Sequence, residues 1–392
     1  MKRVLIVNNI PAPYFDPLFA RLGNEPGWAL KVCYTSTWNE NAGWVEGSVE
    51  ETSYQKLILD RRLPKLTRIL NSPVSAAVAL LGELMRERPN YVISYGYTLL
   101  PQFVSIMWAI LTATPIAIIG DANVHTDKAA GLRRVVKRFW LRKVVSRAAA
   151  LISIGSANRR FWESYGARES QLFEARYAVE NDHFSDLSDT DRARAGELKG
   201  KLHLNATVVF LFVGRLIKRK NVDLIIEAIK RIANPDLALL IVGDGDERAA
   251  LEAIAAGEQR VIFAGGAPHN DLKRYYSLGD VLVLPARDEP WGLVVNEAMA
   301  AGLAVIAHEH CGAAVDLVGP DNGVALRTFE VEELVGAVTH LANDNALLRR
   351  MQACSKEKIR GWSIEAAARG IIKAVTQTGG SVNQATAVGE VE

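Results

Sequence analysis

The sequence has few cysteines, and none is spaced to bind metal. Cys33, Cys311 and Cys354 are the only three in 392 residues, and no CxxC pair occurs. We therefore expect neither a zinc site nor a disulfide framework, and the reducing cytoplasm is the natural compartment. The opening MKRVLIVNNI has an apolar run too short for a signal peptide, so it is interpreted as a first buried strand.

Charge is absent from residues 89–120. Such a run is compatible with a transmembrane helix by its length. The preferred interpretation is a strand at 91–94, a buried helix at 101–111 and a strand at 116–119, because Pro101 and Pro115 stand where the helix and the second strand would begin.

The first strand lacks the GxGxxG that would follow it in a dinucleotide-binding fold. It is followed instead by NNIPAPYFDP, in which Asp16 before Pro17 is typical of a helix N-cap. The alternative for Asp16 is a place at the ligand crevice of a doubly wound sheet. Asp121 and His125 also follow a predicted strand, where either a ligand role or a solvated loop suits them.

Length and rhythm predict two α/β domains. Apolar runs alternate with helical patterns at 4–7, 30–34, 57–59, 91–94, 116–119 and 151–154, and again at 208–213, 237–242, 261–263, 281–284, 304–307 and 324–326. The expected parts are a domain at 1–180, a polar linker at 181–204, a second domain at 205–361, a helix at 362–378 that returns to the first domain, and a disordered tail at 379–392.

The two halves differ in charge. Residues 1–180 hold 23 of the 46 lysines and arginines but only 15 of the 44 aspartates and glutamates. Much of the excess lies in a predicted helix at 132–147, with one broad basic face and an opposite apolar face of Leu132, Val135, Val136, Phe139 and Trp140. The basic face, which includes Arg133, Arg134, Lys137 and Arg138, suits plain solvent, an anionic membrane surface or a phosphate-bearing acceptor. Nucleic acid is not expected, since no recognised binding module occurs.

Residues 284–302, LPARDEPWGLVVNEAMAAG, carry two carboxylates in an unusual place. The stretch reads as a strand end, a turn with Glu289, and a helix from Leu293 to Ala301 that contains Glu297 and stops at Gly302. A helix N-terminus after a strand favours a phosphate. Carboxylates beside it indicate a ligand that also carries hydroxyl groups.

Other motifs in the second half complete this pattern. They are GRLIKRK at 214–220, VGDGDE at 242–247, FAGG at 263–266, EPWGLVVNE at 289–297 and EAMAAG at 297–302. Over about residues 208–326 the chain closely resembles the retaining glycosyltransferases of family 4, which have the GT-B fold of two Rossmann-like doubly wound parallel-sheet domains facing a central cleft. In the first half NIPAPY and GDANVH fit only by position, and the glycines common in the family's first turn are missing.

The resemblance implies transfer of a sugar from a UDP- or GDP-sugar, with retention and without a metal or other cofactor. Arg215 and Lys220 would neutralise the diphosphate, Glu289 would face the donor sugar and Glu297 would bind the ribose. The implied donor site contains Gly214, Arg215, Lys220, Gly243, Phe263, Ala264, Gly265, Glu289, Trp291, Gly292, Leu293, Val294 and Glu297, with His125 contacting the sugar.

A saccharide or lipid-linked acceptor is expected on the side of Asp16, Asp121 and the basic helix. The enzyme would then build surface polysaccharide or glycolipid in the cytoplasm or on the inner face of the cytoplasmic membrane. Two alternatives stay open, a sugar-nucleotide epimerase of related fold and a non-catalytic membrane-associated binding protein.

Overall fold

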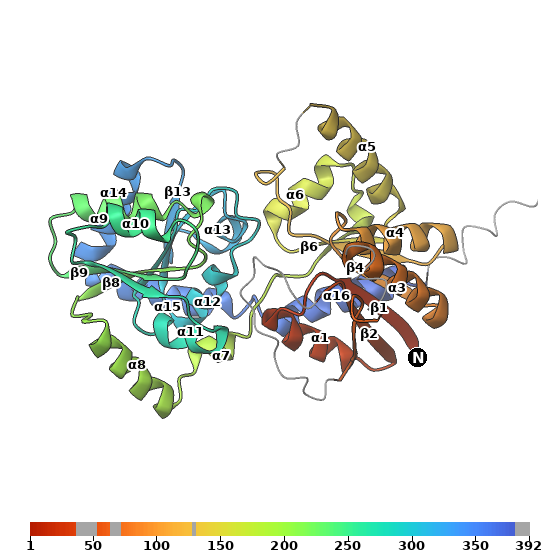
Figure 1. Cartoon of the computed structure of the whole chain (residues 1–392), viewed down its shortest axis with the longest axis horizontal. Coiled ribbons are helices and arrows are strands. Elements are labelled where there is room, and N and C mark those ends of the chain that lie inside the picture. Colours follow the sequence, from red (N-terminus) through yellow and green to blue (C-terminus); the bar gives the residue numbers. More distant parts are fainter. Residues whose placement is uncertain (37–52, 63–71, 128–130, 381–392) are drawn as a thin grey trace, which may run out of the picture. The chain divides into compact units, whose positions relative to one another are not determined.

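The computed structural model describes residues 1–36, 53–62, 72–127 and 131–380 (Figure 1). The chain divides into two compact units. Unit 1 comprises Met1–Arg176 and Ile364–Glu392, and unit 2 comprises Tyr177–Ser363. These boundaries fall within a few residues of the expected 180 and 361.

Unit 1 is built on a seven-stranded parallel sheet of order β3-β2-β1-β4-β5-β6-β7. Every predicted strand of this half is present, and the three-residue β7 is an addition because so short a run shows no pattern. The strands are β1 (Lys2–Asn8), β2 (Trp28–Tyr34), β3 (Gln55–Ile58), β4 (Tyr91–Tyr95), β5 (Ile116–Ile119), β6 (Ala150–Ser153) and β7 (Leu172–Glu174).

The helices of unit 1 form two groups. One group packs into a single apolar core cluster against the sheet and consists of α3 (Ser72–Glu87), α4 (Leu100–Thr112), α5 (Gly131–Arg147) and α6 (Ser156–Ser164). In the other group α1 (Asp16–Gly23) packs against α16 (Ile364–Thr378), which also contacts β6 and β7. The 3₁₀ turns η1 (Pro13–Phe15) and η2 (Glu169–Gln171) complete the unit.

The uncharged segment 89–120 forms β4, α4 and β5, which confirms the predicted order of strand, helix and strand. The backbone hydrogen bonds of β4 and β5 lie within the sheet, where Val92 pairs with Ile116. In the described parts of the chain, no helix combines the length and the hydrophobicity needed to cross a membrane.

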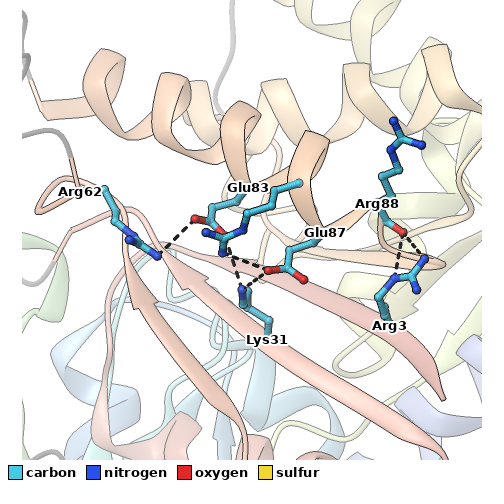
Figure 2. Close-up of polar contacts among 7 residues, drawn as sticks. Arg3, Lys31, Arg62, Glu83, Glu87 and Arg88 are labelled. Carbon is cyan, nitrogen blue, oxygen red and sulfur yellow. Dashed lines mark hydrogen bonds and ion pairs between the residues drawn. The ribbon is translucent and has the colours of Figure 1, made fainter.

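Polar contacts fasten α3 to the sheet (Figure 2). Lys31 of β2 contacts Glu87 at 2.5 Å and Glu83 at 3.5 Å, and Arg62 reaches the other oxygen of Glu83 at 3.4 Å. The ammonium of Lys31 is thus held between two carboxylates of one helix, with its side chain only 13% exposed. A buried charge is tolerated only when paired, so this cluster fixes the position of α3 on β2.

Unit 2 has a six-stranded parallel sheet of order β10-β9-β8-β11-β12-β13. The predicted strands are confirmed with small changes at their ends, as β8 (Val208–Val213), β9 (Leu237–Val242), β10 (Val261–Gly265), β11 (Val281–Leu284), β12 (Ala304–His308) and β13 (Gly323–Leu326). The strands β8, β9, β11 and β12 are buried along their whole length, because helices cover both faces of the sheet.

Helices form a layer on each face of this sheet (Figure 1). One layer holds α9 (Val222–Arg231), α10 (Arg248–Ile254) and α14 (Val331–Asn343), and the other holds α7 (Asn181–Ser185), α11 (His269–Tyr276), α12 (Leu293–Ala301) and α15 (Asn345–Ile359). Two short elements, η3 (Lys218–Lys220) and α13 (Gly312–Leu317), follow β8 and β12. The bounds of α12 are those predicted, and Gly302 ends the helix with a left-handed φ of 90°.

The expected linker is not one. Residues 181–204 form α7 and α8 (Asp189–Lys201), and both belong to unit 2. Ion pairs rather than an apolar face hold α8, because Asp191 accepts from Lys273 at 2.6 Å and from Arg274 at 3.0 Å, both on α11. A helix anchored in this way shows no apolar periodicity, so the sequence pattern missed it.

Two further expectations concern single residues and the tail. The N-cap of α1 is Phe15 rather than Asp16, since a 3₁₀ turn precedes the helix. The Asp16 carboxylate instead accepts a hydrogen bond from Tyr54 at 2.8 Å. The tail predicted to be disordered lies outside the described residues from 381 onward.

Candidate active site

The candidate site of unit 2 begins where the strand order reverses. Successive strands add outward from β8 through β9 to β10, and from β11 through β12 to β13, so the neighbours β8 and β11 form the switch point. Open parallel sheets bind ligands beyond the carboxyl ends of such strands. The segment after β8 is GRLIKRK and the segment after β11 leads to Glu289, so two of the predicted motifs meet here.

Glu289 is the centre of this arrangement. Its Oε2 accepts hydrogen bonds from Lys220 Nζ at 2.6 Å and from Arg219 Nη1 at 2.7 Å. The side chains of Glu289 and Lys220 are 11% and 10% exposed. Burial alone would raise the pKa of Glu289, but the charges of Lys220 and Arg219 outweigh it and keep this pKa below its usual range. Glu289 is therefore ionised at neutral pH.

Arg215, the other predicted cation, is placed differently. It follows β8 directly and its side chain is exposed. Within the described ranges its guanidinium makes no hydrogen bond or ion pair. Of the two predicted cations, Lys220 is therefore already bound to a carboxylate and Arg215 is available to a ligand.

The turn that carries Glu289 is locked to the start of α13. Gly312 N donates to Glu289 O at 3.2 Å, Ala313 N donates to Trp291 O at 2.8 Å, and Cys311 Sγ donates to the same oxygen at 2.8 Å. Gly292, with a φ of 93°, is the N-cap of α12, and a Cβ there would lie 2.8 Å from Cys311 Sγ. Only glycine suits this conformation and this close contact.

The loops after β8 and β9 are fitted together. Gly214 N donates to Val242 O at 3.0 Å, and Leu216 N donates to Asp244 O at 2.9 Å. A Cβ on Gly243 would lie 1.8 Å from Gly214 O, so the two backbones meet only because Gly243 has no side chain. The motifs at 214–220 and 242–247 therefore form one continuous surface.

Glu297 lies on α12 in a different environment from Glu289. It is buried, and Tyr276 Oη donates a hydrogen bond to its Oε2 at 2.6 Å. Burial raises the pKa of Glu297 to about 7, with the bond from Tyr276 opposing the rise. The two carboxylates of the motif therefore differ in charge near neutral pH, since one has cationic partners and the other has a phenol.

The remaining predicted donor residues fall into two sets. Phe263, Ala264 and Gly265 end β10 and are partly buried, and Leu293 and Val294 begin α12 with partial exposure. Trp291, by contrast, is buried against Trp362 with ring centroids 5.0 Å apart. Its indole donates to Asn296 Oδ1 at 2.9 Å. The side chain of Trp291 is thus a packing element, which leaves the backbone of this residue for the site.

The predicted residues of unit 1 lie at the carboxyl edge of its own sheet. Asp121 and His125 follow β5, with Asp121 exposed and His125 partly buried. Asn123 organises their loop, because its Oδ1 accepts from the backbone of His125 at 2.9 Å and of Thr126 at 3.0 Å.

The apolar face expected on the basic helix is not buried along most of α5. Leu132, Val135, Val136 and Phe139 are between 60% and 78% exposed. Leu141, Val144 and Val145 near the end of the helix are buried in the core, and Trp140 packs against it while partly buried. The first half projects from the sheet, so its arginines and its apolar side chains are exposed together. Lys137 is the exception among the basic residues, since it donates to Asp127 at 2.7 Å.

Sequence reasoning missed three residues of the site. Arg219 and Tyr276 contact the two carboxylates, and Cys311 supports the turn between them. The adjacent Arg219-Lys220 pair was a usable signal for the first. No pattern pointed to Tyr276 or Cys311, because their contacts depend on the packing of elements distant in sequence.

Comparison with known proteins finds relatives of this chain. Residues 197–358 match the family described as glycosyl transferases group 1. An alpha-D-kanosaminyltransferase of Streptomyces kanamyceticus is 29% identical over 215 residues, which are 54% of this chain and 55% of that protein. A GDP-mannose-dependent monoacylated alpha-(1-6)-phosphatidylinositol monomannoside mannosyltransferase of Corynebacterium glutamicum is 26% identical over 348 residues, which are 82% of this chain and 85% of that protein.

The fold has solved counterparts. Anabaena HepE, in complex with UDP and glucose, superposes with a TM-score of 0.72 at 15% identity, covering 96% of this chain and 100% of that one. The fold of two parallel Rossmann-like units is GT-B, which this chain shares with solved glycosyltransferase structures. Residues 197–358, which are less than half of the chain, are the part that resembles the glycosyl transferases of group 1.

Proposed function

We propose that this enzyme moves a sugar from a UDP- or GDP-sugar to a saccharide or lipid-linked acceptor with retention of anomeric configuration, as family 4 members do. The observation that carries the proposal is the ionised Glu289 beside Lys220 at the switch point, with Glu297 on the following helix. This arrangement combines cations for a diphosphate with carboxylates for hydroxyl groups.

Departure of the nucleotide places negative charge on the β-phosphate. Arg215 and Lys220 border the same loop, and the N-terminus of α12 adds backbone N–H groups at Leu293 and Val294. Donors fixed in place before reaction stabilise that developing charge more than they stabilise the bound donor. The proposed chemistry therefore uses protein cations in the role that a metal has in other transferases.

Glu289 and Glu297 take different hydroxyl groups in this proposal. Glu289 accepts hydrogen bonds from the donor sugar, and its fixed negative charge stabilises oxocarbenium character at the anomeric carbon. Glu297 accepts hydrogen bonds from the ribose. The bond from the anomeric carbon to the β-phosphate oxygen breaks while the acceptor oxygen bonds to the same face, and the acceptor proton passes to the departing phosphate.

The direct test is nucleoside diphosphate release. Purified protein is incubated with UDP-glucose or GDP-mannose and an acceptor extract, with and without EDTA. The proposal predicts release that EDTA does not suppress and that Lys220→Ala lowers by about 10²–10³-fold. Lys218→Ala, an exposed lysine of the same turn, is the matched control and should match wild type. No release with any sugar nucleotide would refute sugar transfer.

The same assay separates the alternatives. An epimerase would convert the sugar nucleotide without acceptor and without net diphosphate release. A binding protein would show thermal stabilisation by the nucleotide and no turnover. Retention is tested separately by the anomeric proton coupling of the product in NMR, and an inverted product would contradict it.

We further infer that the acceptor is presented at an anionic membrane surface, which α5 contacts. Leu132, Val135, Val136 and Phe139 are exposed on the same half-helix as Arg133, Arg134 and Arg138. Cations beside exposed apolar groups fit the interface of a bilayer that contains acidic lipids. Each Lys or Arg near such a surface contributes about 1 kcal/mol of binding free energy. The inner face of the cytoplasmic membrane is the surface that we propose.

Vesicle binding tests this surface. Arg133→Glu with Arg134→Glu should weaken sedimentation with phosphatidylglycerol vesicles by about thirtyfold or more, since each lost charge removes about 1 kcal/mol. Arg349→Glu with Arg350→Glu, two exposed arginines of α15, is the matched control and should change little. Phe139→Ser tests the apolar contribution. Equal binding by both double variants would refute a role for α5.

A further inference from the structure

Two cations share one oxygen of Glu289. Lys220 Nζ and Arg219 Nη1 both donate to Oε2, at 2.6 and 2.7 Å. Lys220 is buried, whereas the Arg219 side chain is 43% exposed. The arrangement holds more positive charge than ionisation of a single carboxylate requires.

The proposed function asks Lys220 to do two things. In the structure its ammonium is bound to Glu289, yet in the donor complex it would face the diphosphate. As Lys220 turns toward the phosphates, Glu289 loses part of its compensation while staying in a buried place. A buried carboxylate without an adequate partner takes up a proton or shifts position. Either change would remove the charge that faces the donor sugar.

Arg219 is placed to prevent this. Its backbone oxygen accepts from Arg287 N at 2.7 Å, and Asn221 Nδ2 donates to Pro285 O at 2.9 Å. These two bonds fasten η3 to the loop after β11, which carries Glu289. The guanidinium therefore stays within reach of the carboxylate whatever Lys220 does.

We propose that Arg219 is a positioning residue that keeps Glu289 ionised and oriented while Lys220 binds the donor diphosphate. This role rests on the proposed sugar transfer and deepens it. Arg219 acts through Glu289, so its loss should affect turnover more than donor binding.

The other titratable groups around Glu289 leave this role to Arg219. The Cys311 thiol faces it from the start of α13, and burial raises the pKa of this thiol to about 12, so it stays neutral. Asp288 precedes Glu289 in the loop. The guanidinium of Arg287 lies 4.0 Å from the centre of the Phe329 ring, so it has a partner other than Glu289. Arg219 and Lys220 are the cations that contact Oε2.

The test is the pH profile of turnover in Arg219→Ala and Arg219→Lys, measured with whichever of UDP-glucose and GDP-mannose is the donor. In Arg219→Ala the acid limb of the kcat profile should move up by about one pH unit, as expected for loss of one adjacent charge. We expect kcat to fall by up to about tenfold on the acid side of the shifted limb and to recover toward wild type as pH rises above it, with the KM for donor within threefold. Arg219→Lys should restore most of the profile, and Lys218→Ala should leave it unchanged.

A second readout does not need turnover. A ¹³C carboxyl titration of Glu289 with UDP or GDP bound should show a higher apparent pKa in Arg219→Ala than in wild type. Superimposable titrations and kcat profiles would overturn the role of Arg219. Wild-type protein that releases no diphosphate would refute the proposed function instead, and the titration would still report on Arg219. Circular dichroism and thermal unfolding confirm that each variant is folded.

Discussion

Donor binding should release a proton from Glu297, so the affinity for a nucleotide sugar should rise with pH. The carboxyl is buried against Tyr276, and burial raises its pKa to about 7. Ribose hydroxyl groups donate hydrogen bonds, so they select the ionised carboxylate over the protonated form, which has less acceptor capacity. At pH 8 most of the protein is ready to bind, and at pH 6 most of it must first lose a proton.

The magnitude follows from the pKa. With a pKa of about 7, roughly one carboxyl in eleven is ionised at pH 6 and roughly ten in eleven at pH 8, so the apparent affinity should differ about tenfold between these two pH values. Each further pH unit below 6 should cost about 1.4 kcal/mol of binding free energy. Two nearby histidines, His183 and His269, contact Phe184 beside Tyr276, and burial lowers the pKa of each, so they stay neutral over most of this range.

Isothermal titration calorimetry with UDP-glucose or GDP-mannose at pH 6, 7 and 8 measures this effect. Repeating the titration in two buffers of different ionisation enthalpy counts the protons released. Nucleotide sugars are the right probes because each of their two phosphates has a single, strongly acidic ionisable group, so their charge is constant over this range. Tyr276→Phe should steepen the dependence by removing the bond that lowers the pKa. Glu297→Gln should abolish the dependence and weaken binding at pH 8.

The same variant tests the sign of the linkage on stability. Because the folded pKa of Glu297 lies above its unfolded value, the folded state holds this proton more tightly, so stability contributed by the group is lost as pH rises through about 7. Without ligand at pH 8, Glu297→Gln should therefore have a higher free energy of unfolding than wild type, by up to about 3 kcal/mol, as measured by urea denaturation. An affinity that stays constant from pH 6 to 8 in wild type, or a Gln variant that keeps the slope, would refute the reasoning.

Three other predictions concern the scaffold. Gly243→Ala should lower both stability and donor affinity, because its Cβ would lie 1.8 Å from a backbone oxygen. Gly336→Ala, whose Cβ would meet no atom within 4 Å, is the control and should lower neither. Equal effects of the two variants in urea melts and calorimetry would contradict this. Lys31→Met should destabilise the fold by about 3 kcal/mol at pH 7 in urea melts because it leaves Glu83 and Glu87 short of a partner, whereas the more exposed Arg86→Met should cost less than about 1 kcal/mol. The pKa of His269 is lowered by burial, so its contribution to stability is present above pH of about 6.5 and is lost as pH falls. His269→Phe should therefore flatten the acid side of the profile of stability against pH. An unchanged profile would contradict this.

Much of unit 2 could be predicted from the sequence because β8, β9, β11 and β12 are buried along their whole length. A continuous apolar run then marks the whole strand, as at Val208–Val213, and a glycine marks the end of α12 at Gly302. The sequence placed Lys220 and Glu289 at the same edge of the sheet, but it did not predict that the two side chains are in contact. Its distance and the share taken by Arg219 depend on how η3 is fastened to the next loop.

The failures have a common physical origin. The helix α8 is held by ion pairs at Asp191, so it has no apolar periodicity and was missed. The start of α5 does have an apolar face, but this face is exposed rather than packed. The exposure of Phe139 depends on tertiary packing, which a helical wheel does not describe. Asp16 failed as a cap because the preceding 3₁₀ turn moved the start of the helix by one residue.

The return of α16 to unit 1 has a consequence for biosynthesis. Its packing on α1 is reinforced where Arg21 binds Glu365 at 2.6 Å, and Lys2 Nζ donates to Val375 O at 3.3 Å. Unit 2 is continuous in sequence and can close on itself while the ribosome is still translating the last helix. Unit 1 has to wait with an apolar surface uncovered until Ile364–Thr378 leaves the exit tunnel. A nascent chain that stops early would therefore carry a finished unit 2 and an unfinished unit 1, which chaperones and proteases can recognise.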